Sequence, residues 1–97
     1  MAHENAPERD RRAAIVCSHV AIDNLPILRA VRDKPIIPED SGWQFLCDTS
    51  AREDPDVARV WSIYEVVQFE PSLAEFIDCP SGTVLSRKDP LSKWKLE

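Results

Sequence analysis

The chain has 97 residues, 43% of them hydrophobic and 30% charged, which is enough for one domain with a modest core and too apolar for a disordered chain. Twelve basic and seventeen acidic residues give a net charge of −5, so a nucleic-acid backbone would be repelled and a positively charged protein is the more natural partner. No apolar run approaches the ~20 residues that cross a bilayer, and the charged N-terminus is unlike a signal peptide, so we expect a cytoplasmic protein that does not bind membranes.

The N-terminal part predicts a short leader followed by one domain. Residues 1–12 carry six charges and no large apolar side chain after Met1. Such a segment has little to bury and frays in most proteins. We therefore expect a disordered leader at residues 1–12 and a single globular domain at residues 13–97.

Two strands are predicted next. Residues 13–17 form an unbroken apolar run that is typical of a buried strand, with residues 18–20 as its extension. Residues 27–33 predict a second strand. The turn formers Asp23 and Asn24 lie between the two, so we expect them to form an antiparallel hairpin.

The run Asp40-Ser41-Gly42-Trp43 contains turn-forming residues that lead directly into a predicted strand with two large aromatic side chains. Asp and Ser side chains bond nearby backbone amides, and glycine adopts a positive φ without steric cost. Trp43 and Phe45 then share one face of the strand because alternate residues point the same way. The run has two interpretations, a turn that leads into a buried Trp43 or a binding hot spot, and we favour the first.

Loops flank this strand at both ends. Residues 34–41 contain Pro35 and Pro38, which exclude a helix and a central strand, so we expect a rigid loop. Residues 48–56 form the most acidic part of the chain. Because recognition usually resides on loops held by a rigid scaffold, we predict that the acidic loop binds the partner, with the Pro-rich loop beside it. Its carboxylates would steer a basic protein, and they belong to Asp48, Glu53, Asp54 and Asp56.

Two helices are predicted after a fourth strand at residues 57–61. Ser62 and Glu65 fit a capping box, in which each side chain bonds the other residue's backbone amide. Pro71 disfavours helix at the residue before it, so the first helix should stop near Phe69 and a second begin at Pro71.

The C-terminal part completes an α+β plan. Residues 83–87 have the β-branched character of a last strand, and residues 88–97 predict a polar tail with Trp94 as its anchor. We therefore expect a mostly antiparallel sheet of about four to five strands, with two short helices between the last two strands covering one face.

Catalytic and metal chemistry are not indicated. The chain has only two histidines and no Gly-x-Ser-x-Gly elbow, so we expect neither an enzyme nor a cofactor. Three cysteines are an odd number, which suits reduced thiols. Structural zinc sites usually take ligands in close pairs on tight turns, whereas the available ligands lie in separate predicted elements, so we predict buried free thiols and no metal. These ligands are Cys17, His19, Cys47 and Cys79.

The charged side chains of Arg32 and Asp40 are predicted to bind either each other or the backbone. Arg32 is flanked by apolar residues on a predicted strand, and Asp40 lies at the mouth of the strand expected near it. A charge on a partly buried strand face needs a partner. We therefore predict that the two side chains pair or that both bind loop backbone.

Several short runs resemble one family of small bacterial proteins. They are Cys17-Ser18-His19-Val20, Leu25-Pro26-Ile27-Leu28, Arg32-Asp33-Lys34-Pro35, Asp40-Ser41-Gly42-Trp43-Gln44-Phe45-Leu46-Cys47, Pro71-Ser72-Leu73 and Pro80-Ser81-Gly82-Thr83. Together they resemble the immunity protein 33 family, formerly a domain of unknown function, over about residues 14–94. That family commonly has an aromatic residue where Val31 stands here.

The resemblance implies a non-enzymatic immunity protein that binds and neutralises a cognate toxin of a polymorphic toxin system. It brings no catalytic residues, because the family's assigned role is inhibition by binding. The alternative is a general intracellular interaction or regulatory module with another partner. A toxin-like gene beside the chain's own gene would favour the first reading.

Overall fold

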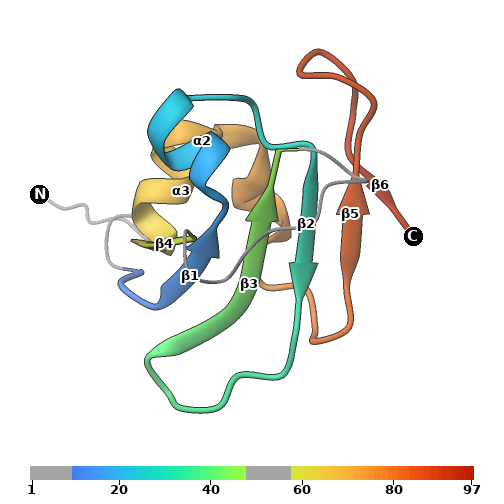
Figure 1. Cartoon of the computed structure of the whole chain (residues 1–97). Helices are drawn as coiled ribbons and strands as arrows, with labels where there is room; N and C mark the ends of the chain where they lie inside the picture. Colours follow the sequence, from blue (N-terminus) through green and yellow to red (C-terminus); the bar gives the residue numbers. More distant parts are fainter. Residues whose placement is uncertain (1–9, 48–57) are drawn as a thin grey trace, which may run out of the picture.

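The computed structural model describes residues 10–47 and 58–97, which form a six-stranded sheet packed against helices (Figure 1). The strand order is β4-β1-β3-β2-β5-β6. The elements are β1 (Ala13–Val16), α2 (Ser18–Asp23), β2 (Arg29–Arg32), β3 (Asp40–Leu46), β4 (Arg59–Ser62), α3 (Ile63–Phe69), the 3₁₀ helix η1 (Pro71–Phe76), β5 (Val84–Ser86) and β6 (Lys95–Leu96). The predicted α+β class is confirmed, and the sheet is larger than expected.

The sheet is mixed rather than purely antiparallel. β1 runs parallel to β3, whereas the other neighbouring pairs are antiparallel. The predicted hairpin of the first two strands is wrong, because β3 lies between β1 and β2. The strand that carries Trp43 and Phe45 takes this central place, where both aromatic side chains are buried.

A short helix replaces the predicted extension of the first strand. The chain turns into α2 directly after Cys17, and Val20 is the helix residue that is buried in the core. The helix ends where Asn24 takes the left-handed conformation, with φ of 59°. Asparagine tolerates this conformation better than most residues, so the predicted turn at Asn24 becomes a helix end.

The helical part after β4 agrees closely with the sequence prediction. The Ser62 hydroxyl accepts from the Glu65 backbone N–H at 3.1 Å, and the Glu65 carboxylate accepts from the Ser62 N–H at 2.8 Å, which completes the capping box. α3 ends at Phe69, and Pro71 begins the next helix. That helix is 3₁₀, and Leu73 N–H donates three residues back to the Glu70 carbonyl at 3.1 Å.

The predicted polar tail adds a strand to the sheet. Within residues 88–97 the pair Lys95–Leu96 forms β6 against β5. The Trp94 indole donates to the Ser72 hydroxyl at 2.9 Å and packs against the core, which anchors the tail as expected. The sheet therefore exceeds the four to five strands expected, and α3 and η1 lie between β4 and β5 rather than between the last two strands as predicted.

One face of the sheet carries the hydrophobic core. Trp43 and Phe45 stack on this face with ring centroids 5.5 Å apart. The helices contribute the opposing side chains. The fully buried residues of the cluster include Val16, Val20, Ile27, Ile63, Val66, Leu73 and Leu85.

Residues 10–12 contact the start of α3. The Arg12 carbonyl accepts from Ile63 N–H at 2.9 Å, and the Asp10 carbonyl accepts from Tyr64 N–H at 3.0 Å. Residues 1–9 of the predicted leader lie outside the described residues. Across residues 10–47 and 58–97, no helix has the length and apolar character needed to span a membrane.

Candidate functional site

Arg32 ties the central strand to the segment that follows η1. Its Nε donates to the Ser41 carbonyl at 2.9 Å, and its Nη1 donates to the carbonyls of Ile77 and Cys79 at 3.1 and 2.7 Å. Its guanidinium carbon also lies 5.8 Å from the centre of the Trp43 ring. Hydrogen bonds from a charged donor are stronger than neutral ones, so Arg32 holds these two segments firmly together.

Asp40 stabilises the turn at the start of β3. Its Oδ1 accepts from Gly42 N–H at 2.9 Å, and its Oδ2 lies 3.4 Å from the Ile36 backbone nitrogen, which donates to it. Arg32 and Asp40 therefore bind backbone rather than each other. This is the second of the two arrangements predicted from the sequence.

Ser41 and Trp43 belong to the buried part of the same turn. The Ser41 hydroxyl donates to the Ala13 carbonyl at 2.6 Å and accepts from Trp43 N–H at 3.1 Å, which locks β3 to β1. The Trp43 indole donates to the Ile77 carbonyl at 3.0 Å. Both side chains are buried, so a partner would meet the loop that they hold rather than these side chains.

The loop between β2 and β3 presents two isoleucines to solvent. Ile36 is 91% exposed and Ile37 is 53% exposed, and they lie between Pro35 and Pro38. In Figure 1 this loop projects beyond the end of the sheet. Prolines restrict the backbone, so the apolar tip is presented on a stiff support. The sequence Pro-Ile-Ile-Pro could have indicated this, because β-branched residues that can join neither a helix nor a central strand have few ways to be buried.

A hollow of about 150 Å³ opens beside this tip. It is lined by the turn at the start of β3, by Ile15 of β1 and by the Asp33–Gln44 pair, whose side chains are joined by a hydrogen bond of 2.9 Å. The hollow therefore combines apolar and polar groups at the base of the exposed loop. Its lining residues are Ile15, Asp33, Lys34, Ile36, Asp40, Gly42, Trp43 and Gln44.

A row of side chains continues from the hollow across the sheet. The strand registers place one residue from each of five strands in line, on the face opposite the core. Within the described residues, the helices pack on the other face, and two members of the row are clearly accessible, Ile15 at 39% and Val60 at 66%. The row is Val60, Ile15, Gln44, Val31 and Val84.

The predicted acidic site follows β3 in the sequence. The described chain stops at Cys47, just after that strand, and resumes at Ala58. The candidate partner-binding residues Asp48, Glu53, Asp54 and Asp56 lie outside the described residues. The two loops are attached to opposite ends of β3, whose seven residues span roughly 20 Å.

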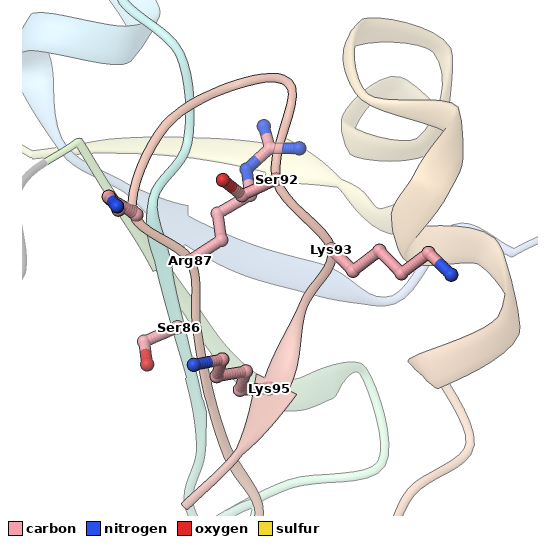
Figure 2. Close-up of a pocket in the computed structure, with 6 residues that line it drawn as sticks. Ser86, Arg87, Ser92, Lys93 and Lys95 are labelled. Atoms are coloured by element: carbon pink, nitrogen blue, oxygen red, sulfur yellow. The ribbon is translucent and has the colours of Figure 1, made fainter.

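A second, larger hollow of about 550 Å³ is basic (Figure 2). Figure 2 shows the Lys93 side chain directed away from Ser86 and Lys95, so the cations do not converge on one point. Its charged lining residues are all cationic. The lining residues are Ser86, Arg87, Lys88, Ser92, Lys93 and Lys95.

Arg87 in this hollow is a structural residue that the sequence prediction missed. Its Nη2 donates to Glu70 at 2.8 Å, and its Nε donates to the Ile27 carbonyl at 3.0 Å. Burial raises the pKa of Glu70, but hydrogen bonds from Ser72 and Arg87 outweigh it, so the pKa lies below the ordinary value. The guanidinium carbon lies 4.4 Å from the centre of the Trp94 ring. Arg87 is therefore occupied by internal contacts.

The structure brings together three of the four candidate metal-ligating residues considered in the sequence. The ligand atoms of Cys17, His19 and Cys47 all lie within 4.8 Å of one another. Cys79 is not in this group. Cys17 is buried, whereas Cys47 and Cys79 are half-buried rather than buried as predicted.

Comparison with known proteins identifies a family. The family model described as immunity protein Imm33 domain matches residues 14–96. No curated protein and no solved structure shows a significant match. The match spans almost all of the described chain and includes the β2–β3 loop, the hollow beside it and the Cys–His group. The chain therefore belongs to the Imm33 immunity protein domain family.

Proposed function

We propose that the chain is a non-enzymatic bacterial immunity protein that binds and neutralises a cognate toxin of a polymorphic toxin system. The family supports toxin immunity in general. The observation that carries the proposal for this chain is the apolar tip formed by Ile36 and Ile37 on a stiff loop. Exposed apolar side chains on a rigid support lose little entropy on binding, which favours affinity.

The proposed interface extends from this tip over the hollow and the row across the sheet. A stable protein interface buries about 800 Å² on each partner and has an apolar centre with a polar rim. Ile36 and Ile37 would supply the centre. The Asp33–Gln44 pair at the hollow would supply part of the rim.

The acidic loop is proposed to steer the toxin. Its four carboxylates would attract a basic surface and occupy the place where the toxin binds its own anionic substrate. The toxin would then be inhibited by occlusion. This assigns affinity to the apolar tip and association rate to Asp48, Glu53, Asp54 and Asp56.

Replacing both Ile36 and Ile37 by Asp is expected to weaken toxin binding by about 1,000-fold, because two hot-spot side chains that contribute about 2 kcal/mol each sum to about 4 kcal/mol. The fold should be unchanged, since both side chains are exposed. The measurements are the dissociation constant for the toxin encoded beside this gene and the survival of cells that express that toxin.

A matched control replaces two exposed aliphatic residues elsewhere, Ile22 and Leu91, by Asp. This variant should bind and protect like the parent. Equal binding by the two double variants, whether unchanged or weakened, would remove the tip from the proposed interface. A neighbouring gene product that neither binds the parent nor harms cells would refute the immunity function itself.

Neutralising the acidic loop with Asp48→Asn, Glu53→Gln, Asp54→Asn and Asp56→Asn should slow association about tenfold at low salt, with little change in dissociation. Salt should reduce the parent's association rate more than the variant's. Neutralising the exposed acids Asp23, Glu75 and Asp78 provides the control, which should change the rate far less. An unchanged association rate in the loop variant would remove this loop from the interface.

A further inference from the structure

The parallel pairing of β1 and β3 creates a group of soft ligands at one edge of the sheet. Parallel strands end at the same edge, so Cys17 after β1 and Cys47 after β3 become neighbours. The Cys17 N–H donates to the Phe45 carbonyl at 3.0 Å, which continues the pairing up to Cys17. The first turn of α2 then adds His19.

The spacing of the three ligand atoms is close to that of a metal site. All three lie within 4.8 Å of one another. Around tetrahedral zinc, with bonds of about 2.3 Å to sulfur and about 2.0 Å to nitrogen, neighbouring ligand atoms are roughly 3.5–3.8 Å apart. Each pair therefore needs to approach by at most about 1.3 Å, which small rotations of side-chain torsions supply.

We propose that Cys17, His19 and Cys47 bind one Zn²⁺ ion. Thiolate and imidazole ligands suit zinc, whereas magnesium and calcium prefer oxygen ligands. Each thiol loses its proton to solvent as its sulfur binds the ion, and His19 binds through a neutral ring nitrogen. Three protein ligands leave a fourth position for water, which is the arrangement of open zinc sites.

The bound ion would fasten three segments of the domain. Cys17 and Cys47 fix the ends of the two parallel strands, and His19 fixes the helix between β1 and β2. An ion that binds only the folded chain stabilises it by mass action. This role is independent of the proposed toxin, so it can be tested without knowing the partner.

The experiment uses the full chain without an affinity tag, reduced with a phosphine and stripped with a chelator. Titration with Co²⁺ should give one ion per chain, with sulfur-to-metal charge-transfer bands and the d–d bands of a tetrahedral site. One equivalent of Zn²⁺ should abolish these bands and raise the melting temperature.

Matched variants separate this site from other ligands. Cys47→Ser and His19→Ala should each weaken zinc binding by about 100-fold or more, since even outer-shell partners contribute 10–100-fold. Cys79→Ser removes a thiol outside the group, and His3→Ala removes the only other histidine of the sequence; we expect both variants to bind like the parent. His19 is exposed, so its variant should remain folded.

Three results would overturn the proposal. The first is a reduced, folded parent chain that gives no charge-transfer bands with Co²⁺. The second is equal weakening by the two control substitutions. The third is a Cys17–Cys47 disulfide in the native chain whose reduction yields thiols without zinc affinity, because the pair would then be a redox pair.

Discussion

Replacing Gly42 by alanine is expected to lower the free energy of unfolding by about 3–5 kcal/mol, a large part of the total for a small domain. Gly42 has φ of +82°, a conformation that disfavours any side chain. An added Cβ would lie 2.0 Å from the Asp33 carbonyl oxygen. The Asp33 backbone cannot shift easily, because its N–H donates to the Gly42 carbonyl at 2.7 Å.

The matched control is Gly82→Ala. Gly82 also has a positive φ, +95°, but an added Cβ would meet no atom within 4 Å. Its cost should be about 1–2 kcal/mol, from backbone conformation alone. Urea unfolding followed by tryptophan fluorescence measures both variants. Equal losses would show that the close approach to Asp33 is not what matters at Gly42.

Local signals were the most reliable guide from sequence to fold. Ser62 and Glu65 satisfy each other's backbone amides within four residues, and Pro71 acts on the residue before it. Both therefore predicted helix boundaries correctly. The alternation of Trp43 and Phe45 likewise predicted which face of β3 is buried.

Sheet order depends on contacts that neighbouring residues do not encode. The sequence favoured pairing of the first two strands because a turn lies between them, yet β1 pairs with β3 and β4. α2 was missed because Val20 is its only buried residue, so it has no apolar stripe of helical period. The parallel pairing that was missed is also what brings Cys17 and Cys47 together.

The sequence predicted the local contacts of the candidate site but not its long-range contacts. The turn residues Asp40 and Gly42 bond each other locally, and their motif was recognised from sequence. The partners of Arg32 include the carbonyls of Ile77 and Cys79, which are more than forty residues away along the chain. No local pattern predicts such partners, so the sequence left two arrangements open.

Replacing Arg87 by methionine is expected to cost about 3–5 kcal/mol, which is typical when one member of a buried ion pair is removed. The Arg87 side chain is only 2% exposed. Methionine is similar in length but donates no hydrogen bond, so Ile27 and Pro90 would each lose a donor to their carbonyls. Glu70 would lose its positive partner at 2.8 Å.

A second substitution identifies the source of that loss. Glu70→Gln in the Arg87→Met background removes the unpaired carboxylate, so it should recover about 1–2 kcal/mol. Glu70→Gln in the parent should instead be destabilising. If the double variant is no more stable than Arg87→Met, the lost carbonyl contacts and packing account for the whole effect.

The pH dependence of stability tests the same pair in the native sequence. Burial raises the pKa of Glu70, but hydrogen bonds from Ser72 and Arg87 outweigh it and hold the pKa below the ordinary value of 4.5. A carboxylate whose pKa is lowered in the folded state stabilises the protein at pH values above its unfolded-state pKa. This contribution is lost as the pH falls through the folded-state pKa.

Unfolding free energies measured from about pH 7 to about pH 3 should therefore fall more steeply below about pH 4.5 for the parent than for Glu70→Gln. Asp10 and Asp89 also have lowered pKa values. Both residues are present in both proteins, so their contributions cancel in the difference between the two unfolding free energies. Parallel curves would mean that the bond from Arg87 to Glu70 does not favour the ionised carboxylate.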